Sequence, residues 1–227
     1  MLPLFPHEDA ERAAEIINRI KPLAETFWLE HDPVEFKSNP YAVMIVALLS
    51  PRTKTQDSRA AMRALFEIAD SPETVAKLSY ETVHSILLKH DIQFPENKAR
   101  HILDAATLLV RNGSDVPRTL GELMQYPGMG WKTSLLTLHL AYELAPEICV
   151  DVHVARIAKR MGLVKRETEK PQAVSRELMD IVPHELWIDV NSCLVFFGKT
   201  RCYPTQPACN GCPVYDLCER VGVKGKK

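Results

Sequence analysis

The stretch QYPGMGWKTS, residues 125–134, places two glycines directly before a segment with helical periodicity. Gly128 and Gly130 lack side chains, so backbone N–H groups there can approach an anion, which the positive end of a following helix also attracts. A P-loop needs glycine immediately before its Lys-Thr pair, whereas Trp131 separates Gly130 from Lys132. The stretch predicts a turn between two helices that binds a nucleic-acid backbone phosphate, although a plain helical hairpin has the same short signature.

The rest of the chain also has helical periodicity. Apolar residues recur at spacings of three and four through Ile16, Ile20, Leu23 and Phe27, which predicts a first amphipathic helix. The apolar run YAVMIVALL, residues 41–49, is typical of a buried helix. Further helices are expected at about 55–69, 72–78, 79–89, 95–111, 119–125, 130–144, 152–162, 170–181 and 184–197. No alternating strand of useful length is found, so the predicted fold class is all-α.

Composition narrows the class of protein. The chain is 46% apolar and 25% charged with a formal net charge of −1, so a nucleic-acid-binding surface would have to be local. The basic stretch at residues 51–63 is one candidate, although charge alone favours a solvated helix face. No run is as long as a membrane span, and the N-terminus lacks a basic region with a cleavage site. We therefore expect a cytoplasmic protein without an export or membrane signal.

Four cysteines lie close together near the C-terminus, with six, two and five residues between them: Cys202, Cys209, Cys212 and Cys218. In a reducing compartment such a group binds metal more often than it forms disulfides. The C-x₂-C pair makes structural zinc a serious candidate, and the spacing matches no common ferredoxin pattern. Either kind of centre would fold a loop with little apolar content. Cys149 and Cys193 lie among apolar neighbours and are predicted core residues.

Two segments together resemble a known family. LMQYPGMGWKTS (123–134), followed by ICVDVHVARIAKRMGL (148–163), is similar to the core of the endonuclease III family of DNA glycosylases, and the resemblance extends from about Pro33 to Cys218. It implies a helix-hairpin-helix motif in which Gly128, Gly130 and Thr133 bind DNA. It also implies two helical domains flanking a DNA-binding cleft, one at 33–145 and one at 1–32 with 146–227. The C-x₆-C-x₂-C-x₅-C pattern resembles the family's 4Fe–4S site, with structural zinc as the alternative.

The family's catalytic lysine and aspartate fall on Lys132 and Asp151. By the resemblance, the Lys132 amine attacks C1′ of the sugar, expels the base, forms a Schiff base and lets β-elimination cut the strand 3′ to the lesion. A nucleophilic amine must be neutral, which predicts a pKa below the usual value of about 10.4. Asp151 would stabilise positive charge on the sugar and help to transfer protons. Without the resemblance, Lys132 is a solvated residue and Asp151 an N-cap for the helix from Val152.

Two further segments match loops that open the duplex in the family. LLSPRTK (48–54) places Arg52 where a gap-filling glutamine is common, and IQFPENKA (92–99) places Phe94 at an apolar wedge position. The alternatives are a surface charge for Arg52 and a hydrophobic staple beside Pro95 for Phe94. The loop YPTQPA (203–208) lacks the positive charge usual in the family, for which Lys199, Arg201 and the tail KGKK are candidate replacements.

The resemblance implies a bifunctional DNA glycosylase/AP lyase of base excision repair, acting as a monomer on oxidised pyrimidines in double-stranded DNA. An adenine-mismatch glycosylase is disfavoured because VMIVALLS (43–50) lacks the acid that such enzymes carry there. Two readings stay open. One is a thymine or uracil mismatch glycosylase of the same fold, and the other is a non-catalytic DNA-binding module with a structural metal.

Overall fold

The computed structural model describes residues 7–31 and 36–223, and every regular element within these ranges is a helix. The all-α prediction is therefore confirmed. The chain divides into two compact units, one formed by Met1–Val34 with Ala145–Lys227 and the other by Glu35–Leu144. The second unit starts two residues after the predicted boundary at 33 and ends one residue before 145, and the junction near 33 lies outside the described residues.

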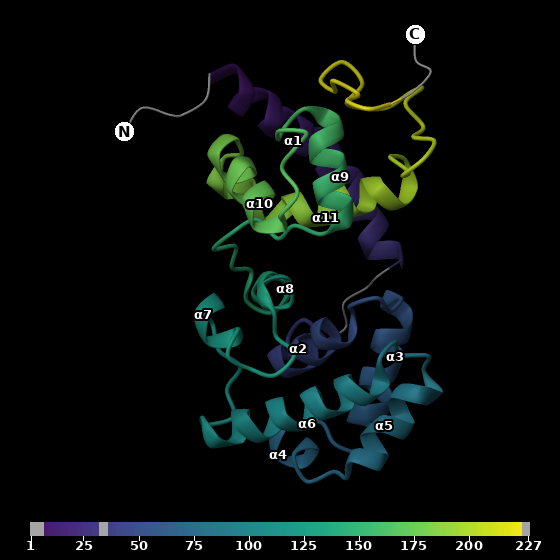
Figure 1. Ribbon diagram of the computed structural model, residues 1–227, viewed down its shortest axis with the longest axis vertical. Helices are drawn as coiled ribbons and strands as arrows, with labels where there is room; N and C mark the ends of the chain where they lie inside the picture. Colours follow the sequence, from purple (N-terminus) through teal and green to yellow (C-terminus); the bar gives the residue numbers. More distant parts are fainter. Residues whose placement is uncertain (1–6, 32–35, 224–227) are drawn as a thin grey trace. The chain divides into compact units, whose positions relative to one another are not determined.

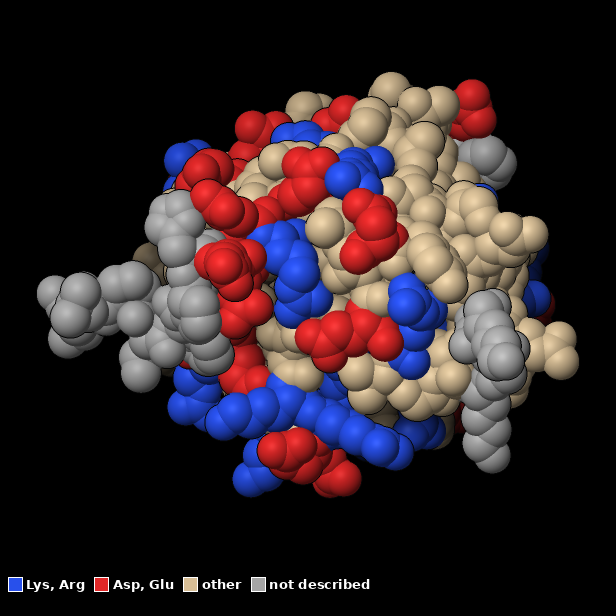
Figure 2. All heavy atoms as spheres, turned by 90° about the horizontal axis from the view of Figure 1, so that it is seen from above, with Lys and Arg blue, Asp and Glu red and all other residues tan. Residues whose placement is uncertain are grey.

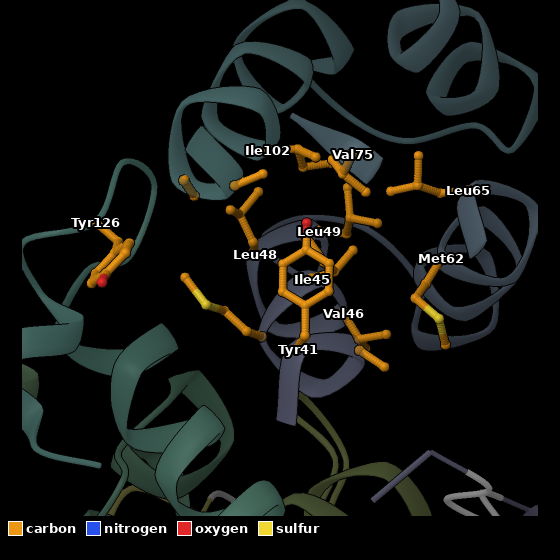
Figure 3. Packing of buried hydrophobic residues seen from close by; sticks show 14 of the residues in the cluster. Tyr41, Ile45, Val46, Leu48, Leu49, Met62, Leu65, Val75, Ile102 and Tyr126 are labelled. Atoms are coloured by element: carbon orange, nitrogen blue, oxygen red, sulfur yellow. The ribbon is translucent and has the colours of Figure 1, made fainter. Parts of the chain in front are cut away.

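The unit Glu35–Leu144 is built around one apolar helix. Its elements are α2 (Pro40–Leu49), α3 (Thr55–Phe66), α4 (Pro72–Val75), α5 (Tyr80–Lys89), α6 (Pro95–Arg111), α7 (Leu120–Leu123) and α8 (Trp131–Tyr142) (Figure 1). Every residue of α2 from Tyr41 to Leu49 is buried, because α3, α6 and α8 pack around it. Figure 3 shows Ile45 and Leu49 of α2 among Met62, Leu65 and Ile102 from neighbouring helices.

Capping side chains begin several helices of this unit, although the helices predicted at 55–69 and 72–78 end early, at Phe66 and Val75. The Asn39 side chain accepts hydrogen bonds from the amides of Tyr41 and Ala42, at 3.0 and 3.1 Å. Ser71 forms a capping box with Thr74, and Ser79 caps α5. Helix α6 ends at Arg111 as expected, followed by Gly113 with a φ of +97°. The helix predicted at 119–125 is shorter, since α7 covers four residues only.

The unit Met1–Val34 with Ala145–Lys227 contains α1 (His7–His31), α9 (Val152–Met161), α10 (Pro171–Ile181), the 3₁₀ turn η1 (His184–Leu186) and α11 (Trp187–Thr200). Helix α11 packs against both α1 and α9. The predicted apolar stripe of α1 is wrong at Leu23, which is 46% exposed. The buried face follows spacings of three and four and uses Ala24 in place of Leu23; its members are Ala13, Ile16, Ile17, Ile20 and Ala24.

The described surface mixes both signs of charge. Figure 2 shows Lys and Arg side chains interspersed with Asp and Glu on the face that it presents, in keeping with the net charge of −1. Within residues 7–31 and 36–223, no helix is both long and apolar enough to cross a membrane.

Cys149 and Cys193 are core residues, with 0% and 1% of their surface exposed. Burial raises the pKa of the Cys193 thiol to about 12. Because the thiolate is the reactive form, we expect Cys193 of the native protein to resist alkylation at about pH 8 while the same reagent labels it after unfolding. Peptide mass spectrometry of the two samples measures this difference. Equal labelling of Cys193 in both would show that the thiol is accessible in the native state.

Candidate functional site

The turn between α7 and α8 is anchored by two buried side chains. Tyr126 and Met129 are 5% and 3% exposed, and the Met129 amide donates to the Tyr126 carbonyl at 3.0 Å. The Tyr126 hydroxyl also accepts from Asn112 Nδ2 at the end of α6, at 3.1 Å. Figure 3 shows Tyr126 on this turn. The buried side chains of Tyr126 and Met129 therefore anchor the turn to the core of the unit Glu35–Leu144.

Glycine is present at positions 128 and 130 for different physical reasons. Gly128 has a φ of +78°, and a Cβ added there would lie 2.8 Å from Nδ1 and 3.0 Å from Cβ of His101. Gly130 has an ordinary φ of −81°, and an added Cβ would meet nothing within 4 Å. Gly130 also caps α8 without a side-chain hydrogen bond. The fold thus requires Gly128, whereas Gly130 leaves open space beside the positive end of α8.

Lys132 and Thr133 lie in the first turn of α8 but differ in exposure. Lys132 is exposed, so its amine can meet a ligand from solvent. Thr133 is only 8% exposed. A DNA contact predicted for Thr133 would therefore come mainly from its backbone amide.

Asp151 lies in the other unit, at the N-terminus of α9. Its Oδ1 atom accepts hydrogen bonds from the amides of His153 and Val154, at 2.8 and 2.9 Å. Asp151 is therefore the N-cap of α9, as the sequence predicts, and these bonds fix its carboxyl group. Its pairing with Lys132, which belongs to Glu35–Leu144, stays a prediction.

The structure brings Arg52 and Phe94 together. The Arg52 guanidinium carbon lies 5.5 Å from the centre of the Phe94 ring. Both residues have left-handed backbones, with φ of 58° and 57°. Phe94 is 51% exposed, which argues against the hydrophobic-staple alternative because a staple buries its ring. Arg52 and Phe94, the two residues predicted to enter the duplex and called the probe residues below, thus form one exposed pair.

Lys98 of α6, four residues after Phe94, was not among the site residues predicted from the sequence. Only 6% of Lys98 is exposed, and its Nζ atom donates to the Leu49 carbonyl at 2.6 Å and the Pro51 carbonyl at 2.9 Å. Burial lowers the pKa of Lys98 to about 8. A signal was present, because Lys98 lies four residues before the buried Ile102 and so shares the apolar face of α6.

The four clustered cysteines lie in the helix-free segment after α11. Cys202 is 8% exposed, and its Sγ atom accepts from Arg160 Nη1 of α9 at 3.2 Å. Burial, together with the neighbouring thiols, raises the pKa of Cys212 and Cys218. In the described part of the chain, no three His, Cys, Asp or Glu side chains converge tightly enough to hold a single metal ion. The thiols are nevertheless near enough to affect one another, and a guanidinium beside them suits an anionic centre.

The uncharged loop 203–208 is held by arginines through its backbone. Arg160 donates to the carbonyls of Tyr203 and Pro204 at 2.8 and 3.0 Å. Arg201, a candidate replacement for the missing charge, donates to the Ala208 and Asn210 carbonyls at 3.1 and 3.3 Å. Its guanidinium is therefore engaged with the loop itself. The KGKK tail lies outside the described residues.

Comparisons with known proteins agree with this geometry. The family model for the HhH-GPD superfamily base excision DNA repair protein matches residues 45–184, more than half of the chain. Endonuclease III of Thermotoga maritima is 32% identical over 191 residues, covering 84% of this chain and 87% of that protein. Endonuclease III-like protein 1 of Gallus gallus is 34% identical over 179 residues, covering 78% of this chain and 63% of that protein.

A similar solved structure is described as a trapped endonuclease III–DNA covalent intermediate in an estranged-adenine complex. It is 27% identical with a TM-score of 0.74, covering 90% of this chain and 96% of that chain. The all-helical fold, the hairpin turn and the sequence similarity therefore indicate the same family. The chain therefore belongs to the endonuclease III family, within the HhH-GPD superfamily of base excision DNA repair proteins.

Proposed function

We propose that this protein removes oxidised pyrimidines from double-stranded DNA and cuts the strand through an imine on Lys132. Its family membership makes it a DNA glycosylase of base excision repair with AP lyase activity. The observation that carries the assignment of the site is the start of α8. There an exposed amine follows a glycine cap whose surroundings are open.

The proposed reaction forms and breaks bonds at a single deoxyribose in successive steps. The Lys132 nitrogen uses its lone pair to bond to C1′, while the electrons of the C1′–base bond leave with the base, which takes up a proton. The nitrogen then loses a proton, and the ring oxygen takes up a proton and leaves C1′ as a hydroxyl group, giving the imine. Removal of a proton from C2′ expels the 3′ phosphate, and water releases Lys132. None of these steps needs an oxidant or a reductant.

Asp151 is proposed as the electrostatic partner of this reaction. Two amides hold its Oδ1 atom, so the carboxylate needs little reorganisation when positive charge develops on the sugar. The proposed role of the carboxylate also includes accepting and returning the protons that are exchanged during the reaction. The capping bonds would thus serve catalysis as well as helix stability.

The hairpin is proposed to bind a DNA phosphate. Three Gly→Ala variants separate the effect of each glycine on stability from its effect on DNA binding. Gly128→Ala should cost about 1–3 kcal/mol of unfolding free energy because of its positive φ and the contact with His101. Gly130→Ala should cost less than about 1 kcal/mol, since its surroundings are open. It should still weaken DNA binding roughly ten-fold, the effect of about 1.4 kcal/mol, because the methyl group obstructs one phosphate contact.

Gly121→Ala on α7 is the matched control, because an added Cβ there also meets nothing within 4 Å. It should bind DNA like the parent protein. Thermal unfolding and fluorescence anisotropy with a duplex measure the two properties. Equal DNA affinity for Gly130→Ala and Gly121→Ala would remove the proposed phosphate from the α8 N-terminus.

Cys202, Cys209, Cys212 and Cys218 are proposed to hold a 4Fe–4S cluster. Four thiolates are the usual ligands of such a cluster, and the Arg160 guanidinium beside Cys202 offsets part of its negative charge. Such a cluster is larger than a single ion, so its thiolates stand farther apart than the ligands of zinc. When bound, it would fix the fold of the helix-free segment.

The substrate range and setting complete the proposal. We propose a monomer that acts in the cytoplasm on double-stranded DNA with damaged bases or abasic sites. Single-turnover kinetics on duplexes with one defined lesion each tests the substrate class. Faster excision of oxidised pyrimidines than of thymine opposite guanine would support it. The opposite order would favour the mismatch alternative.

A further inference from the structure

We propose that Lys98 and Thr53 are positioning residues that lock the Arg52 turn and the Phe94 turn into one rigid element for base extrusion. This inference rests on the proposed function, because it gives Arg52 and Phe94 a shared task at the duplex. It adds a role for two residues that do not themselves reach the DNA. Both turns belong to the unit Glu35–Leu144.

The Lys98 ammonium group ties α6 to the segment after α2. Its three acceptors are the carbonyls of Leu49 and Pro51 and the Thr53 hydroxyl, at 2.6, 2.9 and 3.0 Å. An ammonium has three N–H donors, so this set uses all of them. The Lys98 backbone amide donates to the Phe94 carbonyl at 3.2 Å. One residue thus contacts both turns.

Thr53 closes the connection from the other side. Its Oγ1 atom accepts from Lys98 Nζ and also from the Gln93 amide, at 3.0 and 3.2 Å. The Thr53 amide donates to the Ser50 carbonyl at 3.1 Å, which closes the turn that contains Arg52. The Thr53 hydroxyl therefore connects the residue that follows Arg52, which is Thr53 itself, to Gln93, the residue that precedes Phe94.

The backbones of both turns need such support. Arg52 and Phe94 have φ of 58° and 57°, a conformation that residues other than glycine keep only when their surroundings fix it. The hydrogen bonds of Lys98 and Thr53 fix these turns, and the contact between the Arg52 guanidinium and the Phe94 ring joins the two side chains. Movement of one probe residue would therefore disturb the other.

The central test removes the Thr53 hydroxyl while keeping its shape. Thr53→Val should slow single-turnover excision from a duplex roughly ten-fold to a hundred-fold, because misplaced probe residues open the duplex poorly. Thr53→Ser keeps the hydroxyl and should restore most of the rate. Lys98→Met, provided that it unfolds like the parent protein, should show the same loss.

Two further measurements separate positioning from chemistry. Borohydride trapping on a single-stranded abasic oligonucleotide needs no base extrusion, so Thr53→Val should give the parent level of adduct. In a Phe94→Ala background, Thr53→Val should cause little additional loss, because the element it positions is already incomplete.

The outcomes distinguish this inference from the proposed function. If the parent protein gives no adduct with abasic DNA, the proposed function fails. If the parent gives an adduct but Thr53→Val excises at the parent rate, the positioning role fails. An equal loss on single-stranded and duplex substrates would also overturn it, because the hydroxyl would then support the fold or the chemistry in general.

Discussion

Lys132→Arg should lower excision and strand cleavage by at least about a thousand-fold, the scale expected when a covalent nucleophile is lost. Arginine stays charged and cannot form the imine, yet it keeps the positive charge beside the proposed phosphate site. Because Lys132 is exposed, the variant should unfold within about 0.5 kcal/mol of the parent. Single-turnover kinetics and duplex binding, measured side by side, separate the lost reaction from retained affinity.

Lys89→Ala provides the matched control for this variant. Lys89 is another exposed lysine of the same unit, in the last turn of α5. It should leave both rates unchanged, since no proposed contact involves it. Retention of more than about a tenth of the activity by Lys132→Arg would contradict the assignment, because the scale of nucleophile loss is far larger.

Cys212→Ser should remove most of the iron from the purified protein. We expect about four irons per chain and a broad absorbance near about 400 nm in the parent, with less than about one iron in the variant. Since metal binding and folding are coupled, the helix-free segment at 201–223 should become sensitive to limited proteolysis. Iron analysis, absorbance and peptide mapping of the first cleavage sites measure these effects.

Cys193→Ala is the control for the loss of a thiol. Cys193 is a buried core residue of the same unit and is not a proposed ligand. This variant should keep its iron and colour even where it unfolds at a lower temperature. A parent protein with stoichiometric zinc, or a Cys212→Ser variant with full iron content, would rule out the proposed cluster.

The sequence predicted what depends on local signals. Helix α6 covers the predicted range, Pro95–Arg111, and Asp151 caps α9, because a cap acts on amides two or three residues away. Leu23 shows where the local signal fails. Its spacing fits a helical stripe, yet the face that packs in the structure uses Ala24, because burial depends on the neighbouring helices.

The probe element could not be predicted because its contacts join distant segments. Nothing in LLSPRTK or IQFPENKA shows that Arg52 will lie against Phe94, or that Thr53 will accept from the Gln93 amide. The sequence did contain a signal for Lys98, because it is a cation on an apolar helix face. Its three hydrogen-bond acceptors could be identified only from the folded structure. The hairpin was easier, because its glycines, cap and lysine lie within one short stretch.

The proposed reaction requires the amine of Lys132 to bond covalently to deoxyribose. Borohydride reduction of the parent protein on abasic DNA, followed by nuclease and protease digestion, locates the bond by peptide mass spectrometry. We expect a sugar remnant on the peptide that contains Lys132. A remnant on another lysine or on the N-terminal amine, with Lys132 unmodified, would contradict it.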